Sequence, residues 1–126
     1  MPDRMSMFAS ENNANQILYE FTFTSVTSAV AGRAPDTDAA MDVTNARSII
    51  VQFDTTGSTS VNQDLNVLST LNGTDYDTIP WASTTGIGIA QLITFPVDPG
   101  PAKIKLTLDN NGAATSHASA VVMLRG

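Results

Sequence analysis

The chain has 126 residues and a formal net charge of −6, from twelve acidic and six basic side chains. A chain of this length suits one domain, which buries roughly two-thirds of its unfolded surface on folding. Its bases are scattered, so neither nucleic acid nor an anionic membrane is an expected partner, because both need clustered positive charge. The absence of cysteine excludes a disulfide framework and a thiolate metal site.

The choice of polar residues predicts an all-β fold. The sequence has sixteen Thr, eleven Ser and nine Asn, but only two Glu and two Lys. Exposed helix positions favour Glu and Lys, whereas Thr, Val and Ile suit the pleated surface of a sheet. No segment approaches the ~18 apolar residues that a membrane helix needs. The first residues, MPDRMSMF, lack an apolar run, so no secretory signal is expected and synthesis in a cytoplasm is predicted.

Alternation with a period of two predicts seven or eight short strands. Residues 1–16 show no steady period and are expected to form an N-terminal arm, which leaves 17–126 as a single domain. The expected strands are, in chain order, 17–24, 46–54, 61–71, 76–81, 86–95, 103–109 and 119–126. Short strands separated by turns are typical of a sandwich or a barrel. We predict an antiparallel, jelly-roll-like β-sandwich.

The same short pattern, Asp-x-x-Gly, occurs twice between predicted strands, as Asp54 to Gly57 and as Asp109 to Gly112. An Asp that opens a turn accepts a hydrogen bond from the backbone two residues on, and Gly supplies a positive φ. Two equivalent hairpin-like corners would produce this repeat without any ligand. Loss of either Asp side chain should then cost about 1 kcal/mol of stability. Asn72 and Gly73 form a further turn pattern, which predicts a tight hairpin.

Calcium is the functional alternative at these corners. Asp54, or Asp109 with Asn110 and Asn111, offers the oxygen ligands that calcium prefers. A good site needs six to eight oxygens, and neither stretch has a dense series of acids. The structural interpretation is favoured, no metal is expected, and calcium should leave the melting temperature unchanged.

Catalytic patterns are weak, so we expect no enzyme and no cofactor. The single histidine, His117, has Ser116 and Ser119 as sequence neighbours, but there is no nucleophile elbow. A solvent-facing His on a strand is the better interpretation. The paired acids Asp36/Asp38 and Asp75/Asp77 lie in polar, turn-rich segments, which favours solvated loop acids over a glycosidase pair.

Two groups of residues are candidates for contact with a partner. Trp81 and Tyr76 lie near Asp75 and Asp77, as an aromatic platform with polar neighbours for a sugar would require. The alternative is that Trp81 covers the core from an edge strand and its N–H finds a backbone acceptor. In the arm, the apolar group Met5, Met7 and Phe8 fits either a frayed terminus or an arm that packs onto a neighbouring subunit.

The stretch LNVLSTLNGTDYDTIPW, followed by PAKIKLTLDNNG and SAVVMLRG, resembles small β-sandwich virion proteins of tailed bacteriophages. The likeness covers roughly residues 48–126, in which Ser69 to Tyr76 contain the Asn-Gly pair and an aromatic residue between two strands. It is a pattern of strands and turns, which bacterial surface and sugar-binding sandwiches share. Residues 1–40 have no counterpart in it.

This resemblance implies a structural role in the virion, after synthesis in the host cytoplasm. The expected function is decoration or stabilisation (cement) of a capsid, or a tail accessory role. The expected partners are other copies of the chain, as a homotrimer, and a major capsid or tail protein. Many repeated contacts would supply the affinity. The alternative function is a carbohydrate-binding module of a phage tail or bacterial surface, for which a glycan is the partner.

Overall fold

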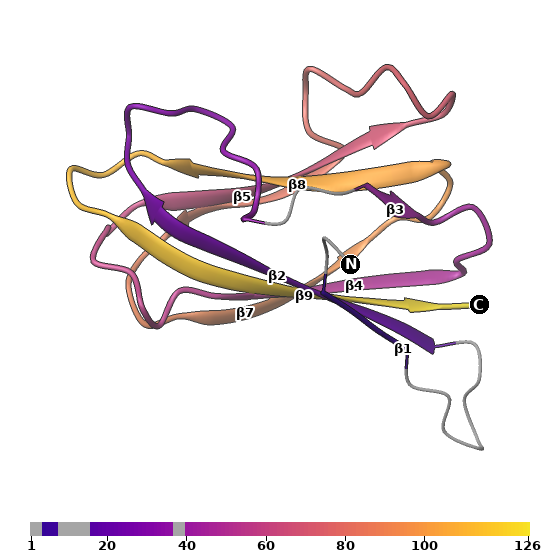
Figure 1. Ribbon diagram of the computed structural model, residues 1–126, viewed down its shortest axis with the longest axis horizontal. Coiled ribbons are helices and arrows are strands. Elements are labelled where there is room, and N and C mark those ends of the chain that lie inside the picture. Colours follow the sequence, from indigo (N-terminus) through magenta and orange to yellow (C-terminus); the bar gives the residue numbers. More distant parts are fainter. Residues whose placement is uncertain (1–3, 8–15, 37–39) are drawn as a thin grey trace.

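The computed structural model describes residues 4–7, 16–36 and 40–126, which form nine strands and no helix. The strands are β1 (Arg4–Met7), β2 (Gln16–Val26), β3 (Met41–Asp42), β4 (Ser48–Asp54), β5 (Gln63–Thr70), β6 (Ala82–Ile87), β7 (Leu92–Val97), β8 (Lys103–Asn110) and β9 (Ser116–Arg125). They form two layers packed face to face (Figure 1). The all-β prediction is confirmed. Over the described ranges, no helix is present that has the length and apolar character to cross a membrane.

Strands β2 to β9 have jelly-roll topology. One sheet has the order β1-β2-β9-β4-β7 and the other the order β3-β8-β5-β6. The antiparallel pairs β2–β9, β3–β8, β4–β7 and β5–β6 match the first half of the chain with the second half in reverse. This pairing describes one long two-stranded ribbon rolled into two sheets, which is the jelly roll. The predicted antiparallel sandwich is therefore confirmed.

The core lies between the sheets and follows the alternation in the sequence. In β4, Ile49, Val51 and Phe53 are buried, while the residues between them are more exposed. Strand β9 alternates in the same way from Ser116 to Leu124. A fully buried aliphatic or aromatic side chain of this kind contributes roughly 1.5–3 kcal/mol. Burial of these inward faces fixes the register of each strand, because a one-residue slip would turn them to water.

Small residues on β9 make room for aromatic rings on both of its neighbours. Ala120 lies opposite Phe21 of β2 on one side and opposite Phe53 of β4 on the other. All three side chains are almost completely buried. The alternation of large and small residues across adjacent strands lets the two rings fill the centre of the sandwich without crowding.

Two predicted strands are placed differently in the structure. Residues 76–81, expected as a strand, belong to a long loop between β5 and β6. Residues 86–95, expected as one strand, are divided between β6 and β7 by a turn at 88–91. Gly86 has a φ of 68°, and Ala90 has a φ of 55°. Both values lie in the left-handed region, which interrupts an extended strand.

The segment expected as an arm contributes an edge strand. β1 pairs antiparallel with β2, with Met5 opposite Tyr19 and Met7 opposite Ile17. β2 in turn pairs with β9, so β1 extends the five-stranded sheet beyond the jelly roll. Phe8 lies outside the described residues. Contact of Met5, Met7 and Phe8 with a partner remains a prediction.

Candidate functional site

The two Asp-x-x-Gly stretches lie at the same end of the sandwich and contact each other. Residues 55–62 connect β4 to β5, and residues 111–115 connect β8 to β9, so each stretch crosses from one sheet to the other. The N–H groups of Thr59 and Ser60 both donate to the carbonyl of Thr115, at 2.8 and 3.0 Å. We call these two connections the double corner. They are arches between sheets, and the expectation of hairpin-like corners is wrong.

A side chain shapes each arch by a local hydrogen bond, but at different positions. Oδ1 of Asp54 accepts bonds from the backbone N–H of Thr56 at 2.9 Å and from its hydroxyl at 2.5 Å. These bonds, the hydroxyl first, lower the pKa of Asp54, and desolvation opposes them. In the second arch Asn110 has this role, because its Oδ1 accepts from the N–H of Gly112 at 2.9 Å.

Asp109 has a different task from the one its sequence position suggested. Its carboxylate accepts hydrogen bonds from Nδ2 of Asn66, at 2.9 Å, and from the backbone N–H of Gly32. These bonds tie the β2–β3 connection to the four-stranded sheet. The prediction that Asp109 forms the local turn bond is wrong, since the neighbouring Asn110 forms it.

Of the two glycines in the double corner, Gly112 is the one needed for space. Neither Gly57 nor Gly112 has a positive φ, so that expectation is also wrong. A Cβ at Gly112 would lie 2.6 Å from Oγ of Ser60. A Cβ at Gly57 would lie 3.4 Å from Cβ of His117, which is an ordinary contact distance. Gly112 therefore permits the close approach of the two arches.

Buried polar groups complete the double corner. Nδ2 of Asn110 donates to the carbonyls of Val26 and Ala114, at 2.9 and 2.6 Å, and Ser60 Oγ donates to its Oδ1 at 2.6 Å. Asn110 and Ser60 are almost fully buried, so these bonds satisfy groups that would otherwise destabilise the fold. The contacts account for the repeated motif as structure. In the part of the chain that the structure describes, no three His, Cys, Asp or Glu residues gather as metal ligands.

A second candidate site is the β5–β6 loop, residues 71–81, which its own polar groups hold in shape. Oδ1 of Asn72 accepts from the N–H groups of Thr74 and Asp75, at 2.8 and 2.9 Å. Its Nδ2 donates to the carboxylate of Asp75 at 2.9 Å. Gly73 has a φ of 83°, as its turn requires. Asn72 and Gly73 thus form a turn inside a long loop, and the predicted tight hairpin is wrong.

The end of this loop is fixed to the sandwich on both sides. The carboxylate of Asp77 accepts from the N–H and the hydroxyl of Ser69, at 3.0 and 2.5 Å. The N–H of Trp81 donates to the carbonyl of Val67 at 2.8 Å, and its indole N–H donates to the carbonyl of Asp98 at 2.8 Å. These bonds hold the loop in a defined shape.

The same loop displays large apolar side chains to solvent. Leu71 is 82% exposed, Ile79 is 79% exposed and Trp81 is 45% exposed. Figure 1 shows the loop standing away from the four-stranded sheet. A loop fixed by hydrogen bonds that nevertheless exposes three large apolar side chains has the character of a contact surface.

The residues expected for a sugar platform all lie in this loop. Tyr76 is half-buried, and Nζ of Lys105 lies 4.3 Å from the centre of its ring. Trp81 has the backbone acceptor that the core-covering interpretation required, yet its ring remains partly open to solvent. The carboxylate of Asp75 accepts a hydrogen bond from Asn72 in the loop, and that of Asp77 accepts one from Ser69 in β5. Trp81 is the residue of this set that offers an open aromatic surface.

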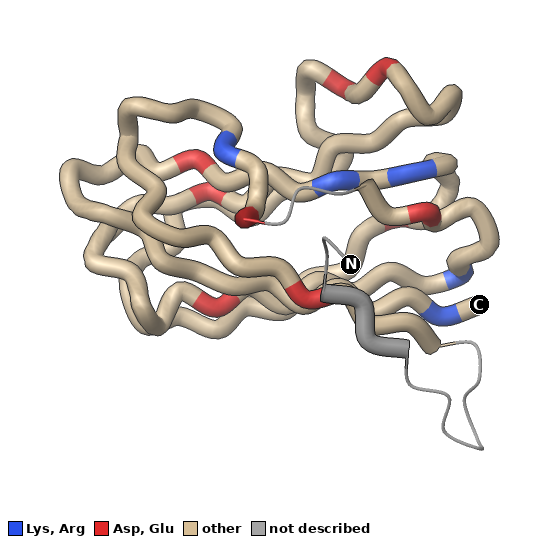
Figure 2. The backbone as a smooth tube through the Cα atoms, in the orientation of Figure 1, with Lys and Arg blue, Asp and Glu red and all other residues tan. Residues whose placement is uncertain are grey.

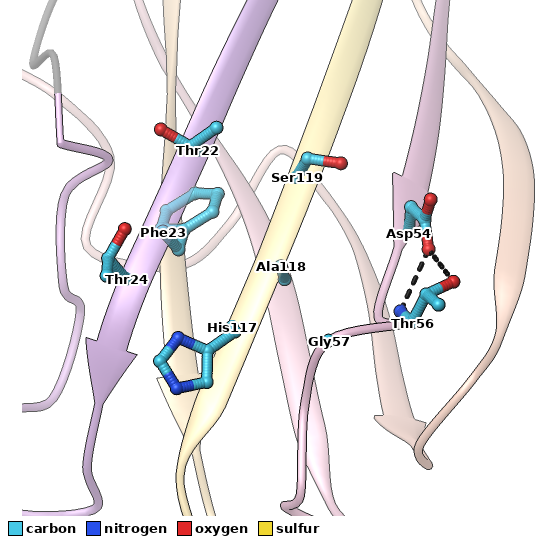
Figure 3. A pocket seen from close by; sticks show the side chains of 9 residues that line it. All are labelled: Thr22, Phe23, Thr24, Asp54, Thr56, Gly57, His117, Ala118 and Ser119. Carbon is cyan, nitrogen blue, oxygen red and sulfur yellow. Dashed lines mark hydrogen bonds between the residues drawn. The ribbon is translucent and has the colours of Figure 1, made fainter.

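His117 lines a shallow depression of about 260 Å³ on the outer face of the five-stranded sheet (Figure 3). The imidazole is half-buried and turned toward β2, where its Nδ1 accepts from the N–H of Ser25 at 3.2 Å. The hydroxyl of Ser119 points away from the imidazole, toward β4 (Figure 3). Ser116 is fully buried in the interior. The depression does not assemble a nucleophile, a base and an acid.

Of the first pair of acids, Asp36 and Asp38, the structure describes Asp36, which makes structural contacts. Asp36 lies 3.7 Å from a guanidinium nitrogen of Arg33 and accepts a bond from the hydroxyl of Thr22 at 3.4 Å. It therefore fixes the β2–β3 connection to β2 and is not simply a solvated acid. Asp38 lies outside the described residues.

The fold and these sites define a small jelly-roll protein whose distinctive surface is a rigid, partly apolar loop. No family model matches the chain, and no curated protein matches its sequence. Its structure is similar to that of the SPBc2 prophage-derived protein YomS. The identity is 12%, the likeness covers 86% of this chain and 95% of YomS, and the TM-score is 0.51.

Two further structures show weaker likeness. The PBSX exported protein XepA is 15% identical over 84% of this chain and 38% of its own, with a TM-score of 0.48. The CBM22-1-GH10 modules of xylanase 10B from Clostridium thermocellum are 11% identical over 98% of this chain and 24% of theirs, with a TM-score of 0.46. At 12% identity, the likeness to YomS concerns the fold alone.

Proposed function

We propose that this chain is a structural protein of a bacteriophage particle, which decorates or stabilises the capsid, or serves as a tail accessory, through protein–protein contacts. The observation that carries the proposal is the β5–β6 loop with its exposed Leu71, Ile79 and Trp81. Exposed apolar groups on a loop that is already ordered favour docking, because little conformational entropy is lost on binding. YomS, which has a similar fold, is a prophage-derived protein, and this supports the choice of a bacteriophage particle in the proposal.

The partners in this proposal are other copies of the chain and a major capsid or tail protein. The homotrimer expected from the sequence resemblance remains a prediction. A particle presents the same partner surface many times, so a modest contact at each site is sufficient for stable attachment. No catalytic role is proposed, because the described residues are engaged in structural bonds at each place where the sequence suggested chemistry.

A second candidate function is glycan binding, which the open face of Trp81 favours. The indole N–H donates to the carbonyl of Asp98, which holds the ring in one orientation, and the residue is 45% exposed. Sugars stack on aromatic rings presented in this way, and Asn or Asp side chains nearby would orient their hydroxyls. In this role the chain would be a binding module of a phage tail or a bacterial surface.

One experiment separates the two. The purified chain is mixed with particles of its phage assembled without it, and separated on a density gradient, while the same preparation is applied to a glycan array. Comigration with particles and no glycan binding is the expected result. A chain that stays at the top of the gradient, or that binds a glycan in a way that Trp81→Ala abolishes without unfolding it, would overturn the proposal.

A further inference from the structure

Strand β7 is an open edge of the five-stranded sheet. It pairs with β4 on one side, and no strand within residues 4–7, 16–36 and 40–126 lies on its other side (Figure 1). Just before it, Thr55 N–H donates to the carbonyl of Gln91 at 2.9 Å, so the backbone of Gln91 faces the β4 side. Because backbone groups alternate along a strand, those of Leu92 and Thr94 face outward.

Pro96 agrees with this orientation. It has no N–H, and a proline inside a sheet is found where the missing donor would face outward from an edge. The outward side of β7 therefore carries the N–H and C=O groups of Leu92 and Thr94, and only a C=O at Pro96. These are the groups that an added strand would meet.

The edge has a proline near one end, but it lacks the charged side chains that natural sheets also place there. Edge strands are usually guarded by charged side chains, lysine above all. Residues 78–97 contain no charged side chain, in a protein whose net charge is −6 (Figure 2). Two copies of such an acidic chain repel each other over most of their surface, and β7 is a side on which they can approach without opposing like charges.

Apolar groups reach this edge from the core. Ile93 and Phe95 pack against the core cluster but remain only half-buried. Leu92 is 62% exposed on the outer face. A strand added beside β7 would cover part of all three side chains and close the core at this side.

We infer that β7 is a contact between two copies of this chain, paired antiparallel about a two-fold axis at Ile93. Leu92 of one copy lies opposite Thr94 of the second, and their outward N–H and C=O groups bond to each other. The same strand serves both copies, as a two-fold contact requires. β6 is less suited, because Gly86 with its φ of 68° and a register shift interrupt its pairing. The inference deepens the proposed function, on which it rests, by naming a surface through which two copies pair, and a two-fold contact of this kind gives a dimer in place of the homotrimer that the resemblance implied.

The test is the solution mass of the full chain, measured by sedimentation velocity over a range of concentrations. Wild type is expected to dimerise. Thr94→Pro removes an outward N–H and leaves the backbone hydrogen bonds to β4 in place, and it should weaken the dimer at least about tenfold. Thr94→Val is its matched control, because it also loses the hydroxyl that accepts from Gln52 but keeps the N–H.

A second pair of variants tests the uncharged character of the edge. Leu92→Lys should give monomers, whereas Val30→Lys, at an apolar residue that is 48% exposed in the β2–β3 connection, should dimerise like wild type. Circular dichroism confirms that each variant is folded. A wild type that stays monomeric at all concentrations, or a Leu92→Lys variant that dimerises unchanged, would overturn the inference. If the wild type is a monomer but still comigrates with phage particles, only the β7 contact is contradicted. If it dimerises through β7 but does not bind the particles, only the proposed function is contradicted.

Discussion

At the scale of single residues, Gly112 is the tightest point of the double corner. A methyl group there would meet Ser60 Oγ at 2.6 Å, and Ser60 cannot turn away without giving up its bond to Asn110. We predict that Gly112→Ala lowers the free energy of unfolding by about 1–3 kcal/mol, the usual range for overpacking. Urea denaturation measures this value.

Gly57→Ala is the matched control, since the equivalent contact there is 3.4 Å and its φ is not positive. We expect a change within about 0.5 kcal/mol. If the two substitutions had the same effect, the close packing of the arches would not be the reason for glycine at 112. Recovery of stability in the double variant Ser60→Ala, Gly112→Ala would identify Ser60 as the obstacle.

Asp54 is predicted to stabilise the first arch in a pH-dependent way. Hydrogen bonds from the Thr56 hydroxyl and N–H lower its pKa below the ordinary value of 3.8. A carboxyl group whose pKa is lower in the folded state contributes its full stability above the unfolded pKa and loses it as the pH falls through the folded pKa. Asp54→Ala should therefore cost about 1 kcal/mol or less at neutral pH, given its partial exposure.

The measurement is urea denaturation of wild type and Asp54→Ala at about pH 7 and about pH 2.5. The difference between the two proteins should shrink at the acidic pH. Asp98→Ala removes the same charge from an exposed side chain in another loop, and serves as the control. A difference that persisted unchanged in acid would mean that the charged carboxylate is not the stabilising group.

At the scale of elements, β1 and β7 occupy opposite edges of one sheet, and a truncation separates their roles. β1 lies outside the jelly roll, so a chain that lacks residues 1–15 should fold, with a melting temperature within about 5 °C of the full chain. Its dimer through β7 should persist. A truncated chain that folds but no longer dimerises would place the contact at the N-terminal segment, where the sequence suggested an arm with Met5, Met7 and Phe8.

The sequence predicted the elements whose inward residues alternate and missed those that depend on partners distant in the chain. Ile49, Val51 and Phe53 identify β4 because burial on one face leaves a period of two. Met41 and Asp42 form β3 only by pairing with Ile104 and Lys103, which no local pattern reveals.

The candidate sites were predictable to a similar extent. The repeat of Asp-x-x-Gly located the double corner, but not the exchange of roles between Asp109 and Asn110 or the steric need for Gly112. Those depend on Asn66, Gly32 and Ser60, which approach from other strands. The exposure of Leu71 and Ile79 was missed because both fall inside predicted strands, 61–71 and 76–81, whose apolar residues are ordinarily taken as core.

At the scale of the whole molecule, surfaces of different polarity lie on different parts of the sandwich. The double corner is polar and engaged in its own bonds, and the β7 edge is uncharged (Figure 2). The β5–β6 loop stands away from the four-stranded sheet (Figure 1), and its large apolar side chains are exposed. In the proposed particle, the loop contacts the capsid or tail protein while β7 contacts another copy. The two surfaces therefore have independent tests.

The most direct test of the proposed function is the affinity of loop variants for phage particles assembled without the chain, measured by cosedimentation. The double variant Leu71→Asp, Ile79→Asp changes two side chains that are about four-fifths exposed, so the fold should remain intact. Val30→Asp makes the same kind of change elsewhere and is the control. We predict that the loop variant binds at least about tenfold more weakly, whereas the control binds as wild type does. Unchanged binding of the loop variant would contradict the assignment of the loop as the docking surface.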